Sequence, residues 1–114
     1  MEKNIELSLL LMYYGSFITQ RQQKFMKLNV DEDLSLSEIA QQEGISRQGV
    51  HDTLKRAKLQ LFEAEAKLGL VKRTLAVREG LDALEKDILA VDIEEPKKQK
   101  LLLLVKALKE IWEV

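Results

Sequence analysis

The chain has 114 residues, and its 46% hydrophobic and 32% charged residues suit one compact soluble domain and exclude a disordered chain. Lysine and arginine total 18 against 19 acidic residues, so the formal net charge of −1 excludes the strongly basic coat of a non-specific nucleic-acid binder. Without cysteine and with one histidine, His51, the chain cannot form disulfides, thiolate sites or a multi-histidine metal site. No acidic residue stands in the apolar context that acid–base catalysis requires. We therefore expect neither an enzyme nor a bound cofactor or metal.

The apolar segment at residues 7–18 is the part of the N-terminus most similar to a membrane-spanning sequence. Ser8, Gly15 and Ser16 interrupt it, whereas a spanning helix needs about 20 apolar residues. The N-terminus also lacks the small-residue cleavage site of a secretory signal. We expect a cytoplasmic protein with no membrane insertion.

The composition predicts an all-α fold with five or six helices in a single domain over residues 1–114. Glycine (5) and proline (1) are scarce, and good helix formers dominate. The first predicted helix, at residues 4–14, is apolar over most of its circumference. Because such a helix is normally covered on more than one side, we expect the C-terminal helices or another subunit to cover it.

Two capping-box spacings mark the next helices. Thr19 precedes Gln22 by three residues, and Ser35 precedes Glu38 by the same distance. In such pairs each side chain satisfies a backbone amide of the first turn. They predict a second helix that starts at Thr19 and a short third helix after Ser35. Between these helices, residues 29–33 predict a polar, acidic loop.

Residues 36–61 meet the physical requirements of a helix-turn-helix. Ala40 is small enough for two helices to cross closely, and Gly44, four positions later, tolerates the positive φ of a sharp turn. Val50 then supplies the aliphatic side chain that docks the second helix. A continuous apolar stripe without a breaker extends this helix over residues 47–68.

The outward face of the 47–68 helix is the candidate nucleic-acid interface. With Val50 facing inward, Gln48, Asp52 and Lys55 fall near the opposite side of the helix, and Arg47 and His51 lie on its flank. Arginine and glutamine can hydrogen-bond guanine and adenine edges, and lysine and arginine can contact phosphates. The predicted nucleic-acid-binding residues are Arg47, Gln48, His51, Lys55, Arg56 and Lys58.

Two amphipathic helices are predicted in a C-terminal extension at residues 71–114. The first covers residues 71–90, with Gly80 as a weak point, and the last begins near Pro96, which a first helical turn tolerates. The predicted inward positions of the first are Leu75, Leu81, Leu84 and Ile88. One face of the last helix carries Leu101, Leu104, Val105, Leu108, Ile111 and Trp112. Because one small core cannot readily hide this face and the apolar first helix as well, we expect a homodimer.

The segment from Thr19 to about Leu61 resembles region 4 of bacterial sigma-70-type factors. The matching residues are Thr19-Gln20-Arg21-Gln22, Leu28, Leu36-Ser37-Glu38-Ile39-Ala40, Gly44-Ile45-Ser46 and Val50. The whole chain, from ELSLLLMYYGSFITQRQQ to its leucine-rich end, resembles the YlxM family of small bacterial helix-turn-helix proteins, which is linked to the signal recognition particle pathway. We therefore expect a helix-turn-helix core at residues 19–68 with a C-terminal helical arm. In sigma region 4 the recognition helix contacts promoter DNA, and the resemblance assigns this role to Arg47, Gln48, His51 and Lys55.

Two functions are compatible with these features. The first is a regulatory DNA-binding protein that takes part in the signal recognition particle pathway. The second is a module that binds the RNA or protein of the signal recognition particle and uses the helix-turn-helix without DNA. The basic residues at 47–58 favour the first function. Asp52, which repels phosphate, the balanced net charge and the apolar ends favour the second.

Overall fold

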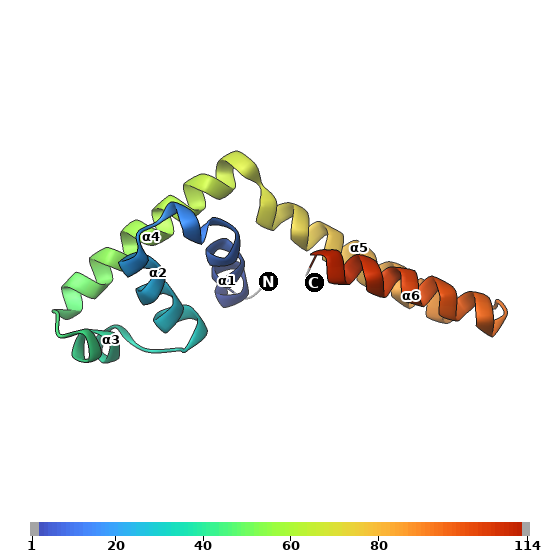
Figure 1. Ribbon diagram of the computed structural model, residues 1–114, viewed down its shortest axis with the longest axis horizontal. Helices are drawn as coiled ribbons and strands as arrows, with labels where there is room; N and C mark the ends of the chain where they lie inside the picture. The colour runs from blue at the N-terminus through green and yellow to red at the C-terminus, as the bar shows by residue number, and fades with distance from the viewer. Residues whose placement is uncertain (1–2, 113–114) are drawn as a thin grey trace. The chain divides into compact units, whose positions relative to one another are not determined.

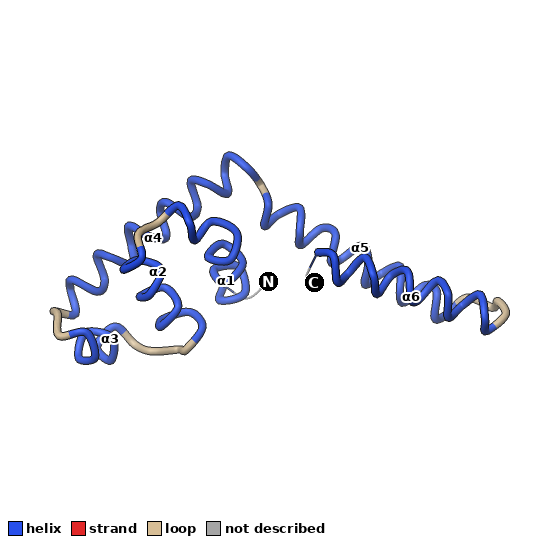
Figure 2. The backbone as a smooth tube through the Cα atoms, in the orientation of Figure 1, coloured by secondary structure: helices blue, strands red, loops and turns tan. Residues whose placement is uncertain are grey.

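A computed structural model describes residues 3–112, and all regular structure in that part of the chain is helical (Figures 1 and 2). The predicted all-α fold is confirmed there, and the α-helices number six within this range. The helices in chain order are α1 (Lys3–Tyr14), α2 (Gln20–Met26), α3 (Leu36–Glu43), α4 (Arg47–Leu68), α5 (Leu70–Ala90) and α6 (Glu95–Trp112). A 3₁₀ turn, η1 (Gly15–Phe17), precedes α2, and a π-helical turn, η2 (Lys27–Asp31), follows it.

The chain forms two compact units, the first of which ends at Val71 while the second begins at Lys72. In the first unit the long helix α4 lies against α1, α2 and α3 (Figure 1). Its buried stripe recurs at spacings of four, three and four, so that it follows one side of the helix. The stripe consists of Val50, Leu54, Ala57 and Leu61. The largest side chains packed in the same unit are Leu10, Tyr14, Phe25, Met26 and Ile39.

Local hydrogen bonds start the helices of the first unit where the sequence predicts them. The Thr19 hydroxyl accepts from the Gln22 amide at 3.1 Å, and the Gln22 side chain accepts from the Thr19 amide at 2.8 Å. Ser35 and Glu38 form the same reciprocal pair at the start of α3. Both predicted capping boxes are therefore confirmed, and each satisfies amide groups that the first helical turn leaves without partners.

The segment after α2 differs from its prediction as a loop at residues 29–33. The chain continues from α2 into the π-helical turn η2, in which the Glu32 amide donates to the Lys27 carbonyl at 3.1 Å. Leu28 and Val30 are buried in this turn, whereas the acidic side chains of residues 31–33 are exposed. The prediction is wrong for residues 29–31 because burial of these two apolar side chains keeps the backbone helical despite the polar sequence around them.

A polar contact joins α1 to the junction between α4 and α5. The Tyr14 hydroxyl donates to Glu65 Oε1 at 2.6 Å and accepts from the Leu70 amide at 3.0 Å. The same carboxylate oxygen accepts from the Val71 amide at 3.0 Å. Burial is the main cause that raises the pKa of Tyr14. Glu65 and Tyr14 thus satisfy two amides of the first turn of α5, directly after Gly69 ends α4 with a φ of 65°.

The second unit contains an antiparallel pair of helices, α5 and α6. Lys98 Nζ donates to the Leu89 carbonyl near the turn between them, and Lys109 Nζ lies 2.8 Å from Asp82 Oδ1 further along. Lys109 lowers the pKa of the Asp82 carboxyl through this hydrogen bond. Helix α5 continues through Gly80, so this glycine does not interrupt it.

Four apolar positions of α5 were predicted to face inward, and in the structure they differ in their exposure to solvent. Ile88 is buried, Leu75 and Leu81 are half-buried, and Leu84 is 46% exposed. The prediction is therefore wrong for Leu84, because α6 alone does not cover the full width of the apolar face. Of the helices within residues 3–112, none is both long and apolar enough to cross a membrane.

Candidate nucleic-acid interface

The turn between α3 and α4 has the geometry that the helix-turn-helix prediction requires. Gly44 has a φ of 68°, and its amide and that of Ile45 both donate to the Ala40 carbonyl. A Cβ at Gly44 would have no other heavy atom within 4 Å, so glycine is favoured there by its backbone conformation and not by lack of space. Ser46 then caps α4 by accepting from the Gly49 amide at 3.0 Å. The prediction for Gly44 is confirmed.

Helix α4 is anchored on one side and exposed on the other. Val50 and Leu54 are buried against the rest of the first unit. On the outward side, most of the predicted nucleic-acid-binding side chains reach solvent, and only Lys58 is half-buried. The exposed members of the predicted set are Arg47, Gln48, His51, Lys55 and Arg56.

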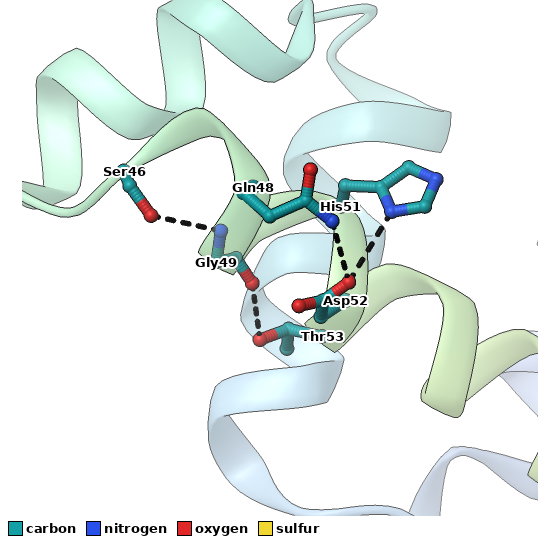
Figure 3. A network of polar contacts seen from close by, with 6 residues as sticks. All are labelled: Ser46, Gln48, Gly49, His51, Asp52 and Thr53. Carbon is teal, nitrogen blue, oxygen red and sulfur yellow. Dashed lines mark hydrogen bonds and ion pairs between the residues drawn. The ribbon is translucent and has the colours of Figure 1, made fainter.

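Three outward side chains of α4 form a polar network around one carboxylate oxygen (Figure 3). Gln48 Nε2 donates to Asp52 Oδ1 at 2.9 Å, and His51 Nδ1 lies 3.4 Å from the same oxygen. These contacts, with Gln48 as the larger cause, lower the pKa of the Asp52 carboxyl. Asp52 is therefore an anion at neutral pH, in the middle of a face that is otherwise mostly basic.

Shallow depressions flank this network on both sides of α4. One, of about 370 Å³, brings Arg56 and Asp52 of α4 near Arg21 of α2. The other, also of about 370 Å³, brings His51, Lys55 and Lys58 of α4 together with residues of η2 and α3. The basic side chains thus border the network on two sides.

Two basic residues of α2, Arg21 and Lys24, add positive charge near this face and differ in their surroundings. The Arg21 guanidinium lies 5.2 Å from the centroid of the Phe25 ring, which supports its position beside Arg56. Lys24 Nζ instead forms an ion pair with Glu43 at 2.9 Å. Arg21 is therefore the basic residue of α2 that lies beside the candidate interface, a feature that depends on how α2 packs against α4. Residues 3–112 contain no group of three or more acidic or histidine side chains that could hold a metal ion.

Comparisons with known proteins agree with this geometry. Residues 1–103 match the family model described as "Putative helix-turn-helix protein, YlxM / p13 like", UPF0122. A UPF0122 protein of Acetivibrio thermocellus is 43% identical over 93 residues, which cover 82% of this chain and 80% of the relative. A UPF0122 protein of Thermoanaerobacter sp. (strain X514) is 38% identical over 108 residues, which cover 95% of this chain and 92% of the relative.

A shorter match has higher identity. A UPF0122 protein of Desulforamulus reducens is 56% identical over 68 residues, which cover 60% of this chain and 58% of the relative. The helix-turn-helix motif of this family suggests nucleic-acid binding. With the matching turn at Gly44 and the exposed face of α4, the predicted resemblance is confirmed: the chain belongs to the UPF0122 family of YlxM/p13-like helix-turn-helix proteins.

Proposed function

We propose that this protein is a regulatory DNA-binding protein of the bacterial cytoplasm and that its helix α4 enters the major groove. In this proposal the protein acts in the signal recognition particle pathway. The observation that carries the proposal is the exposure of Arg47, Lys55 and Arg56. These side chains lie on a helix whose opposite side is buried through Val50 and Leu54. A helix held from behind by a core can present its free side to base edges and phosphates. The proposed function is binding alone, with no catalytic step and no cofactor.

The charges around α4 suit a phosphate backbone on each side of the inserted helix. Lys55 and Lys58 border one depression, and Arg21 and Arg56 border the other. Because the net charge of the chain is only −1, this local clustering supplies the electrostatic attraction in the proposal. Each phosphate contact adds about 0.9 to the slope of log affinity against log salt concentration.

We further propose that the protein binds DNA as a homodimer formed through α6. Four exposed apolar residues on α6 recur at spacings of three, four and three, which is the heptad pattern of a helix–helix seam. They are Leu101, Leu104, Leu108 and Ile111. Val105 and Lys109 lie on a neighbouring face that is engaged with α5, so this seam is available to a second copy. A dimer doubles the number of phosphate contacts.

The salt dependence of binding tests the DNA-binding proposal. A duplex is first selected from a random pool with the full chain, and its affinity is then measured over a range of salt concentrations. Lys55→Ala should weaken binding and reduce the slope by about 0.9 for each protomer that contacts DNA. Lys86→Ala, which removes an exposed lysine of α5, is the matched control and should leave the slope unchanged. Failure of the parent chain to enrich any duplex would contradict the proposal.

A second candidate function is favoured by Asp52. An anion on the exposed face of α4 repels phosphates, and the contacts from Gln48 and His51 keep it ionised. This repulsion favours a protein contact over a nucleic-acid contact at Asp52, within a module that binds the protein or RNA of the signal recognition particle and uses the helix-turn-helix without DNA. Recovery of the tagged protein from its own cells, with sequencing of both bound DNA and bound RNA, separates the two. Consistent absence of signal recognition particle RNA and protein would contradict this second function.

A further inference from the structure

The orientation of the Gln48 amide follows from its partner. A carboxylate only accepts hydrogen bonds, so an amide that contacts it must turn its NH₂ group toward it. Gln48 Nε2 donates to Asp52 Oδ1 at 2.9 Å, and Figure 3 shows the amide oxygen pointing away from Asp52. The four-residue spacing along α4 places both side chains on one face of the helix. The network therefore directs an acceptor, Gln48 Oε1, away from the carboxylate.

Asp52 contributes a second acceptor to the same exposed surface. Its Oδ1 receives the contacts from Gln48 and His51, and Oδ2 takes part in neither. The low pKa of this carboxyl keeps both oxygens unprotonated at neutral pH. Between the basic residues that border it, this short stretch of α4 thus presents one acceptor from each of two side chains.

A protein side chain that only accepts hydrogen bonds can distinguish among the bases in the major groove. Guanine presents the acceptors N7 and O6 there, and thymine presents O4, so both repel an anionic acceptor. Adenine offers its N6 amine beside the acceptor N7. Cytosine offers its N4 amine and has no acceptor of its own on this edge, and a carboxylate pairs with this amine. The O6 of the paired guanine lies beside the N4 amine, as the O4 of thymine lies beside the N6 amine of adenine. Cytosine is consequently the base that best matches the Asp52 carboxylate.

We propose that Asp52, oriented by Gln48, selects a cytosine in the duplex by accepting a hydrogen bond from the exocyclic N4 amine. This inference rests on the proposed DNA-binding function and adds base specificity to it. It also gives the acid a role within a basic face. Asp52 weakens binding to phosphates in general, and it raises the affinity for sites that have cytosine at one position. A site bound by this chain then contains a fixed cytosine where the N-terminal half of α4 meets the groove.

Selection from a random duplex pool with the full chain tests the inference. The parent should enrich sites with one fixed position at which cytosine is preferred about tenfold over guanine, which corresponds to about 1.4 kcal/mol. Asp52→Asn replaces one acceptor with a donor and so resembles the asparagine side chains that pair with N6 and N7 of adenine. Its preference at that position should move from cytosine toward adenine, while its affinity for random duplex rises. Gln48→Ala should reduce the preference for cytosine without moving it to another base.

A control variant and two possible outcomes distinguish failure of base selection by Asp52 from failure of DNA binding. Glu63→Gln removes another exposed carboxylate of α4, outside the network, and should select the same sites as the parent. If Asp52→Asn selects the same base with the same preference as the parent, the inference is overturned while DNA binding stands. If the parent enriches no duplex, both are overturned. Because Asp52 is exposed, circular dichroism should show an unchanged fold for its variant.

Discussion

The two units of the molecule bury their apolar side chains to different extents. In the first unit, Leu10, Tyr14 and Leu61 are among several large side chains with no exposed surface. In the second unit, Ile88 and Val105 are the buried hydrophobic residues within the described range, whereas several leucines of α6 are 40% to 65% exposed. The difference follows from the number of elements: four helices and two helical turns surround a core in the first unit, and a pair of helices has a single shared face. The first unit therefore encloses a core of its own, and the second leaves apolar side chains of α6 exposed.

The largest expected effect contrasts one leucine from each unit. Leu61→Ala should lower the free energy of unfolding by about 2–5 kcal/mol, because it leaves a cavity in a closed core. Leu103→Ala removes a leucine of α6 that is 65% exposed and should change this free energy by less than about 0.5 kcal/mol. Urea unfolding followed by circular dichroism measures both. Equal costs for the two variants would contradict the contrast.

The next prediction concerns the homodimer proposed to form through α6. Sedimentation should give a mass above the 13.1 kDa of one chain for the parent, and Leu108→Glu should shift it toward the monomer. A charge in an apolar seam loses the burial of the leucine, about 1.5–3 kcal/mol, in each copy. Leu103→Glu adds the same charge to α6 away from both the seam and α5, and should leave the mass unchanged. A parent chain that stays monomeric at high micromolar concentration would refute the homodimer.

Alanine substitutions of one glycine in each unit, Gly44 and Gly80, should change stability in opposite directions. Gly44→Ala forces a side chain into a left-handed conformation and should cost about 1–2 kcal/mol. Gly80 lies inside α5, where a Cβ would meet nothing within 4 Å, so Gly80→Ala should stabilise by about 0.5–1 kcal/mol. Thermal unfolding of both variants measures the difference. A stabilising Gly44→Ala would show that the turn does not need the left-handed conformation.

Alkaline pH should affect the first unit through Tyr14. Its pKa is raised from the ordinary value of 10.0, so the folded chain holds this proton more tightly than the unfolded chain. The resulting stabilisation is complete below pH 10 and is lost as the pH rises through the higher pKa of the folded state. Unfolding free energies measured between pH 8 and about 11 should therefore decline at the alkaline end. Tyr14→Phe should show a smaller decline, and an equal decline would assign the effect to other groups.

The candidate interface could largely be predicted from the sequence because it is a local feature of one helix. The periodicity of 3.6 residues that buries Val50 and Leu54 also exposes Arg47, Gln48 and Lys55. The spacing of Gln48 and Asp52 permits their contact, but only the side-chain conformations place the amide hydrogens on the carboxylate. Arg21 joins the interface through the packing of α2 on α4, which the spacing along α4 does not encode.

The six α-helices within residues 3–112, the two capping boxes and the turn at Gly44 could be predicted from the sequence, because each depends on residues no more than about four positions apart. Tertiary structure decided the features that depend on distant segments. The contact of Tyr14 with Glu65 spans 51 residues, and the exposure of Leu84 depends on how much of α5 is covered by α6. Burial of Leu28 and Val30 likewise converts an expected loop into the turn η2. Short-range hydrogen bonds and periodicity can be recognised from residues close together in the chain, whereas burial depends on how the whole unit packs.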